Sequence, residues 1–210
     1  MFKIHCDAQV GLHCCGPLTP ALLSLFPSLS MAPVFVLVSC CYHRMDPHSA
    51  QFPLSQALTS LGHLLPPPPR RPFLLRLGAN EGVERWQEQG EAEHRRHMME
   101  VGRRAVLEVV AERRGIKLGR KRAGSTVSER WGVDKVVEEE VEQELRGLGG
   151  KLHLLELLTG LQFLMQRVIE ELIATDRACY LYECGVSKIN LARIFDGSIS
   201  PRNIAICASK

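Results

Sequence analysis

The sequence of 210 residues predicts an α/β fold, in which a partial parallel sheet is interrupted by a helical insertion and completed by a terminal β-hairpin. Two apolar runs near the amino terminus flank a short helix-prone stretch, which is the strand, helix, strand unit of a parallel sheet. A long amphipathic pattern followed by two further apolar runs occupies the carboxyl-terminal quarter. The chain is 45% hydrophobic and 23% charged, a composition that excludes a disordered, collagen-like or purely coiled-coil protein.

The first strand is expected over residues 8–13, which form a short apolar run. The following Gly16-Pro17-Leu18-Thr19-Pro20 predicts a turn, with Thr19 as the cap of a helix over residues 21–26. Residues 34–38 are continuously apolar and rich in β-branched side chains, which is typical of a strand buried on both faces. Residues 1–43 are therefore predicted to be a partial α/β core.

Residues 44–150 are predicted to form a helical insertion. The run Pro66 to Pro69 must be extended, and we interpret it as a stiff connector, with a ligand for an aromatic-lined groove as the alternative. The residues that follow are charged and helix-prone, and their Trp86 and Trp131 are expected to pack under helices. No internal repeat is found.

Charge is unevenly distributed within this insertion. Basic residues dominate from Arg70 to Arg122, ending in Arg120-Lys121-Arg122, whereas Asp134 to Glu144 is strongly acidic. We interpret both stretches as solvated helix faces. The alternative is that the basic run binds RNA, which would make binding strongly salt-dependent.

Residues 151–210 are predicted to complete the core. Apolar residues recur there at alternating spacings of four and three, which predicts one face of a long helix packed on the sheet: Leu154, Leu158, Leu161, Met165, Val168 and Leu172. Residues 189–195 and 203–208 are expected to be the two strands of a terminal hairpin.

Both unusual side-chain clusters follow predicted strands. His13-Cys14-Cys15-Gly16 comes after the first, and Ser39-Cys40-Cys41-Tyr42-His43 comes after the second. In open α/β sheets ligands bind beyond the carboxyl ends of the strands. If the two strands are neighbours, both clusters face one crevice.

Cysteine and histidine are the ligands that zinc prefers, so a metal site has to be considered at these clusters. No C-x-x-C knuckle is present, and adjacent residues of an extended segment point to opposite faces. We therefore expect no metal site. Nothing in the sequence indicates a lowered thiol pKa, so a cysteine nucleophile is not predicted either.

Charge, cysteine content and hydropathy limit the class of protein further. The net charge of +3 is too small to indicate a nucleic-acid partner by itself. The eight cysteines include two adjacent pairs, a poor disulfide framework, so we expect reduced thiols and an intracellular location, in the cytoplasm or the nucleus. Prolines break the uncharged stretch between Asp7 and His43, so no transmembrane segment is expected.

Four ordered segments resemble the methyltransferase-like protein 25 family, including its 25B branch, also named ribosomal RNA adenine dimethylase domain-containing protein. They are VGLHCCGPLTPALLSLF, VFVLVSCCYHRMDP, FPLSQAL and SPRNIAICASK. The resemblance covers residues 8–62 and 151–210, and it is weak across the insertion. It implies a Rossmann-like class I fold that uses S-adenosylmethionine, with residues 8–13 as the fourth strand and 34–38 as the fifth.

The same resemblance implies roles for the two clusters. His13, Cys14 (or Cys15) and Gly16 would match the family's H-x-C-G element and lie nearest the cofactor. In the C-C-Y-H element, Tyr42 would position or stack on the methyl acceptor, Cys40 and Cys41 would line the pocket, and His43 would accept a proton. Cys15 and Pro17 depart from the more usual H-A-C-G-D pattern, which removes one acidic ligand contact.

Such methyltransferases begin with a strand, a glycine-rich turn and an acidic residue for the ribose, and no such arrangement precedes Ala8. We expect an amino-terminally truncated, carboxyl-terminal part of a methyltransferase that is inactive as an isolated chain. The alternative is a non-catalytic module that binds protein or RNA. The methyl acceptor, RNA or protein, and the oligomeric state are left open by the sequence.

Overall fold

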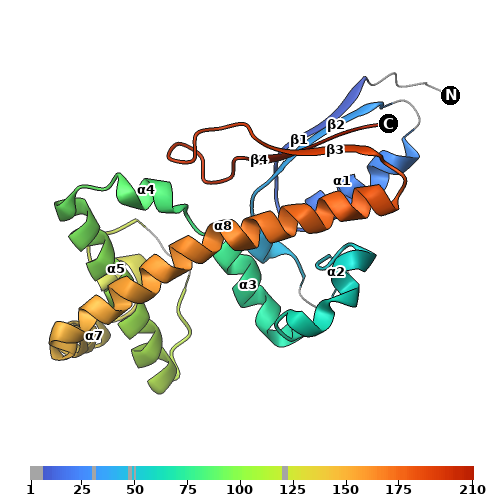
Figure 1. Cartoon of the computed structure of the whole chain (residues 1–210). Coiled ribbons are helices and arrows are strands. Elements are labelled where there is room, and N and C mark those ends of the chain that lie inside the picture. The colour runs from blue at the N-terminus through green and yellow to red at the C-terminus, as the bar shows by residue number, and fades with distance from the viewer. Residues whose placement is uncertain (1–6, 30–31, 47–48, 50, 120–122) are drawn as a thin grey trace. The chain divides into compact units, whose positions relative to one another are not determined.

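The structure is a computed structural model that describes residues 7–29, 32–46, 49, 51–119 and 123–210 (Figure 1). Contacts divide the chain into two compact units. The first holds residues 1–88 and 161–210, and the second holds residues 89–160. The basic run Arg120-Lys121-Arg122 lies outside the described residues.

A four-stranded mixed sheet forms the centre of the first unit (Figure 1). Its strands are β1 (Ala8–Cys14), β2 (Val34–Ser39), β3 (Lys188–Arg193) and β4 (Ile204–Ser209), in the order β1-β2-β4-β3. Strands β1 and β2 are parallel, and β4 runs antiparallel to both β2 and β3. The predicted α/β class, the partial parallel sheet and the terminal hairpin that completes it are confirmed.

The register explains the continuous apolar character of β2. Val36 pairs with Val10 on one side and with Cys207 on the other, so that β2 has a hydrogen-bonded neighbour on each edge. Along β2, Phe35 and Leu37 are fully buried on one face of the sheet. A strand in this position cannot tolerate charged side chains on that face, because burial of an unpaired charge costs on the order of several kcal/mol.

One face of the sheet is covered by α1 (Leu18–Leu25) and by the carboxyl-terminal part of α8 (Leu152–Glu183). The rings of Phe26 and Phe35 stack with centroids 4.9 Å apart at the centre of this layer. The other buried apolar residues of the layer are Cys14, Leu23, Leu37, Leu181, Val186, Ile206 and Ala208. Burial of these side chains is the main driving force that holds α1 and α8 on the sheet.

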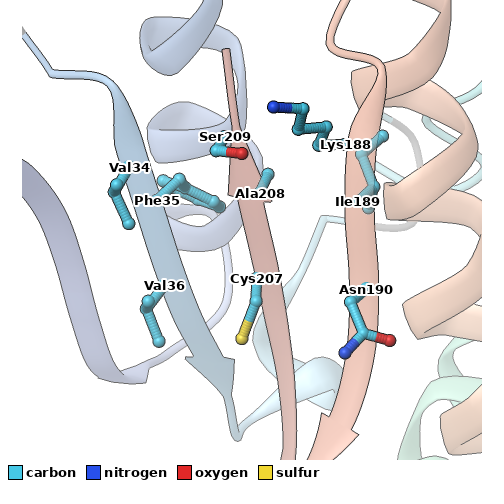
Figure 2. A pocket seen from close by; sticks show the side chains of 9 residues that line it. All are labelled: Val34, Phe35, Val36, Lys188, Ile189, Asn190, Cys207, Ala208 and Ser209. Carbon is cyan, nitrogen blue, oxygen red and sulfur yellow. The ribbon is translucent and has the colours of Figure 1, made fainter.

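The opposite face of the sheet carries exposed apolar side chains. Val10 on β1 is 69% exposed, and Leu12 on the same strand is exposed as well. Figure 2 shows a hollow on strands β2, β4 and β3, lined by Val34, Phe35, Val36, Lys188, Ile189, Asn190, Cys207, Ala208 and Ser209. This hollow does not include the strand-end clusters, so it is not the predicted crevice.

Short helices complete the first unit. Their bounds are η1 Phe26–Ser28, η2 Tyr42–Arg44, α2 Gln56–Ser60, η3 Gly62–Leu64, η4 Pro68–Arg70, α3 Arg71–Gly78 and α4 Val83–Gln87. They enclose a second core, made of Tyr42, Met45, Phe52, Leu74, Leu75, Ile169 and Ile173. Met45, Phe52, Leu74 and Leu75, predicted as part of the insertion, therefore pack against Ile169 and Ile173 of α8. Trp86 packs there against Phe163 of α8.

The second unit is helical. It contains α5 (Glu91–Arg113), α6 (Val127–Trp131), α7 (Lys135–Leu148), η5 (Gly149–Lys151) and the first residues of α8. Helices α5 and α7 pack through an apolar seam made of Val106, Leu107, Val110, Val137, Val141 and Leu145, with Val127 of α6 beside it. Asp134 caps α7 by accepting a hydrogen bond of 2.8 Å from the amide of Val137.

The opposite charges of the second unit pair with each other. Arg103 on α5 donates to Glu142 on α7 at 2.7 Å, and Arg113 donates to Glu144 at 2.6 Å. The guanidinium of Arg104 lies 3.7 Å from the ring centroid of Trp131. The described basic and acidic stretches are thus helix faces whose charges are largely paired within the chain. No described helix is long and apolar enough to span a bilayer.

Two local predictions are wrong. The first is the face of α8: Leu161 is 56% exposed and Met165 and Val168 are also exposed, whereas Ile169 and Ile173 are buried. The buried face could not be recognised by its apolar residues, because it also carries Gln166, Glu170, Asp176 and Arg177, which have partners elsewhere in the first unit.

The second wrong prediction concerns Thr19. Helix α1 begins at Leu18 behind Pro17, and Thr19 does not cap it. The Thr19 hydroxyl instead donates a hydrogen bond of 2.8 Å to the carbonyl oxygen of Cys14. This bond ties the start of α1 to the end of β1.

Candidate functional site

The loops after β1 and β2 lie side by side at one edge of the sheet. The two strands are parallel neighbours, so their carboxyl ends meet there, as the sequence predicts for adjacent strands. The backbone amide of Gly16 donates a hydrogen bond of 3.3 Å to the carbonyl oxygen of Cys41. The two predicted clusters are therefore in direct contact.

Gly16 allows this close approach. Its backbone has a φ of +51°, and a Cβ atom at this position would lie 2.9 Å from both Cβ and the carbonyl oxygen of Arg44. Both the left-handed conformation and the lack of space exclude a larger residue. Gly16 therefore sets the separation between the two loops.

An irregularity in β1 decides where the adjacent Cys14 and Cys15 point. Leu12 pairs with Val38, but the next pair in register joins Cys14 to Ser39, so His13 is left as an extra residue with a φ of +57°. Cys14 consequently enters the core, where burial raises the pKa of its thiol. Cys15 remains in the loop, and the exposed His13 lies at its edge.

The thiols of Cys15, Cys40 and Cys41 converge. Their Sγ atoms are 2.9 Å apart for Cys15 and Cys40, 3.4 Å for Cys15 and Cys41, and 3.6 Å for Cys40 and Cys41. The three residues form a group of possible metal ligands, with all three sulfur atoms within 4.8 Å of one another. The expectation that Cys40 and Cys41 point to opposite faces is wrong.

A tight turn explains why these neighbouring side chains point the same way. The amide of Tyr42 donates to the carbonyl oxygen of Cys40 at 3.2 Å, and Cys41 between them has φ −94° and ψ 68°. These values are close to an inverse γ-turn, in which the chain reverses over three residues. The alternation of an extended strand has therefore ended before Cys41.

The thiols of Cys15 and Cys40 differ in acidity. Hydrogen bonds from Cys40 and Cys41 stabilise the thiolate of Cys15 and lower the pKa of its thiol. Burial, and then the hydrogen bond to Cys15, raises the pKa of Cys40 to about 12. Cys15 is therefore a stronger acid than Cys40.

Tyr42 lies beneath the cluster and is only 3% exposed. Its hydroxyl donates a hydrogen bond of 3.1 Å to Glu170 on α8, whose carboxylate also pairs with Arg202 at 3.2 Å and accepts from Gln166 at 2.8 Å. Burial, and then the charge of Glu170, raises the pKa of the Tyr42 hydroxyl. The ring has no exposed surface on which a methyl acceptor could stack in this conformation, and the predicted role of Tyr42 stays a prediction.

Two further charged residues of α8 anchor the loops around the site. Arg177 is buried and donates to the Ser39 hydroxyl at 2.7 Å, with its guanidinium 5.0 Å from the Tyr42 ring centroid. Asp176 accepts hydrogen bonds from the amides of Leu54 and Ser55 at 2.8 and 2.9 Å. Both anchors join segments more than 120 residues apart in the sequence.

Sequence reasoning missed Glu170, Asp176, Arg177 and Arg202. Arg202 lies within the segment SPRNIAICASK, which carried the family resemblance, and this was the available signal. The three residues of α8 had no comparable signal, because charged side chains on a helix are usually solvated.

His43 lies on the exposed side of the same short helix η2. Partial burial, followed by the positive charges of Arg76, Arg44 and Arg202, lowers the pKa of its imidazole. The neutral ring therefore predominates at pH 7, which leaves one nitrogen able to accept a proton.

Two comparisons with known proteins relate this chain to methyltransferases. A family model described as a methyltransferase domain matches residues 3–48, which include both strand-end loops. A curated mouse (Mus musculus) protein named "Probable methyltransferase-like protein 25" is 27% identical over 234 aligned residues, covering 96% of this chain. The chain is thus similar to methyltransferases. It is similar at the family level to methyltransferase-like protein 25, as the sequence segments indicate.

The match covers 37% of the mouse relative, so the chain spans little more than a third of that protein. No solved structure gives a significant match. Proteins that share one fold can act on many different substrates, so this similarity does not identify the methyl acceptor.

The loops at the strand ends partly fit the cofactor that this methyltransferase family suggests. They lie at the carboxyl ends of two parallel strands, where ligands of such sheets bind, and Gly16 brings the first loop into close contact with Arg44 of the second. Among the described strands, none is followed by a glycine-rich turn; the pair Gly149 and Gly150 follows helix α7 instead.

Proposed function

We propose that this chain forms one wall of an S-adenosylmethionine-dependent methyltransferase site, made by the loops after β1 and β2. The observation that carries the proposal is the contact between Gly16 and Cys41 at the carboxyl ends of two parallel strands, the ligand-binding edge of such sheets. The family match over residues 3–48 supports it, because that match includes both loops.

In such a site the donor supplies an electrophilic methyl group on a sulfonium. Its transfer requires that the protein align a nucleophile with this methyl group, and it requires no covalent intermediate with the protein. His13 and Gly16 would border the donor, with the thiol of Cys14 behind them in the core. Cys40 and Cys41 would line the acceptor side, and neutral His43 would take the proton that the acceptor releases. Buried Tyr42 would act as a positioning residue, since it holds the loop on Glu170.

From the family resemblance, we propose that the methyl acceptor is a nucleophilic group on an RNA or on a protein. Turnover would require a second wall, with a glycine-rich turn and an acidic residue for the ribose, and the described strands of this chain contain neither. We therefore expect the isolated 210-residue chain to bind the donor weakly and to have no turnover of its own.

The test is a calorimetric titration of S-adenosylmethionine into the reduced chain, after circular dichroism has established that it is folded. Saturable binding that His13→Ala weakens, with His63→Ala as the matched exposed histidine control, is the expected result. A folded chain that shows no heat of binding would reject a donor-binding role for these loops.

A second candidate function is a non-catalytic protein-interaction module. The exposed apolar residues along α8 favour it, because a stripe of this kind is typical of a docking surface: Leu154, Leu157, Leu158, Leu161, Leu164, Met165 and Val168. Absence of donor binding, together with concentration-dependent self-association that Leu164→Glu abolishes in sedimentation velocity, would favour this function over methyl transfer.

A further inference from the structure

Three sulfur atoms from two different loops converge at the carboxyl ends of β1 and β2. Cys15 follows β1, and Cys40 and Cys41 follow β2. The three Sγ separations lie between 2.9 and 3.6 Å. In a tetrahedral zinc site with Zn–S bonds of 2.3 Å, sulfur atoms are roughly 3.8 Å apart, so a small outward movement of the side chains would accommodate the ion.

We propose that Cys15, Cys40 and Cys41 form a binding site for a thiophilic divalent cation of the Zn²⁺ class, with the fourth coordination position open. The proposal goes beyond methyl transfer, and it does not depend on whether the chain binds S-adenosylmethionine. Three thiolates select soft and borderline cations over Mg²⁺ and Ca²⁺, which require oxygen ligands.

The backbone holds the three ligands in place before any ion binds. The Cys41 carbonyl oxygen accepts hydrogen bonds from Gly16 at 3.3 Å and from Arg44 at 3.0 Å, which joins the two loops. Thr19 holds the carbonyl oxygen of Cys14, the residue before Cys15, at 2.8 Å. A site whose ligands sit on a supported backbone loses less conformational entropy on binding.

The support extends below the cluster. Ser39, the residue before Cys40, accepts a hydrogen bond from buried Arg177, and Tyr42, the residue after Cys41, is anchored on Glu170. Each end of the Cys40-Cys41 pair is therefore tied to α8. Both cysteines are partly exposed, as is Cys15, so an ion can enter from solvent.

The open fourth position follows from the ligand inventory. Within the part of the chain that the structure describes, the group of ligands contains three cysteines and no histidine or carboxylate. Zinc sites with three protein ligands leave a position for water or for a further ligand, whereas closed structural sites use four. An exogenous thiol or a water molecule would complete this site.

A disulfide between Cys15 and Cys40 is the competing interpretation, because their sulfur atoms are the closest pair. It would leave Cys41 without a function in the cluster, whereas a cation uses all three thiols. Metal binding also displaces the thiol protons, which go to the buffer, and it requires no oxidant.

The experiment is a Cd²⁺ titration of the reduced full chain, followed by the ultraviolet thiolate-to-cadmium charge-transfer absorption. One Cd²⁺ per chain with an absorption that corresponds to three thiolates is expected, and excess Zn²⁺ should remove the band. Cys15→Ser, Cys40→Ser and Cys41→Ser should each weaken Cd²⁺ binding by more than about tenfold, since each removes a direct ligand and even second-shell changes cost 10- to 100-fold.

Matched controls come from other partly exposed cysteines of the chain. Cys179→Ser and Cys207→Ser should leave the stoichiometry and the affinity unchanged, with the fold of every variant checked by circular dichroism. The proposal is overturned if these controls weaken binding as much as the ligand variants do, if no saturable Cd²⁺ binding occurs, or if peptide mapping of the chain before reduction shows a Cys15–Cys40 disulfide.

Discussion

The hydroxyl of Tyr42 donates a hydrogen bond of 3.1 Å to Oε1 of Glu170, a residue 128 positions later in the chain. This single bond connects the loop after β2 to the buried face of α8. Glu170 also pairs with Arg202, just before β4, so that three separate segments meet at one carboxylate. The shape of the strand-end loops therefore depends on a buried polar network and not only on apolar packing.

The first prediction concerns this network. Tyr42→Phe should lower the free energy of unfolding by about 2 kcal/mol, because it leaves a buried carboxylate with one hydrogen bond fewer. Urea unfolding measures the change. Tyr180→Phe is the matched control, since the Tyr180 hydroxyl donates to Ser24 at the surface, and it should cost no more than about 0.5 kcal/mol. Equal effects of the two substitutions would contradict a structural role for Tyr42.

The second prediction concerns Gly16. Gly16→Ala should destabilise the chain more than Gly185→Ala does, although both glycines have a positive φ. An added Cβ at Gly185 meets no atom within 4 Å, whereas at Gly16 it would lie 2.9 Å from Arg44. Strain alone costs about 1 kcal/mol at either position, and the overlap at Gly16 should add roughly 1–3 kcal/mol. Thermal unfolding of the two variants gives the comparison, and a smaller loss for Gly16→Ala would refute the close contact.

The third prediction concerns thiol reactivity and its pH dependence. Alkylation requires the thiolate, and a lowered pKa means that more thiolate is present at a given pH. Because the pKa of Cys15 is lowered and that of Cys40 is raised to about 12, iodoacetamide should label Cys15 well before Cys40 between pH 7 and 8. Peptide mass mapping over time measures both rates.

A variant of the same cluster tests the cause of that difference. Cys40→Ala removes the hydrogen bond that contributes most to lowering the Cys15 pKa, so labelling of Cys15 should slow at pH 7. An unchanged rate would show that the cluster does not set the acidity of Cys15.

The fourth prediction distinguishes the two faces of α8. Ile173 is fully buried, so Ile173→Ala should cost about 2–5 kcal/mol of unfolding free energy. Leu161→Ala should change it by less than about 0.5 kcal/mol, because Leu161 is mostly exposed. Chemical denaturation of both variants decides which face packs on the core. A large loss for Leu161→Ala, with little effect at Ile173, would restore the face that periodicity predicts.

The sequence by itself determined the local elements and the similarity to methyltransferases. The continuous β-branched run from Val34 to Val38 predicts a strand, and the order of the other runs predicts the hairpin that completes the sheet. Burial of that strand on both faces was wrong, because Val34 is 40% exposed on the face opposite Phe35 and Leu37. The residues of the strand-end clusters could also be named from their position after two neighbouring strands.

Only the tertiary structure decided which side chains meet. The γ-turn at Cys41 and the extra residue at His13 bring three thiols together, and neither irregularity is visible in residue types. The buried face of α8 was hidden for a related reason: Glu170 and Arg177 are stable inside because partners more than 120 residues away satisfy them. Hydrophobic periodicity reflects only the tendency of the side chains in one segment to be buried away from water. It carries no information about polar partners that the rest of the chain supplies.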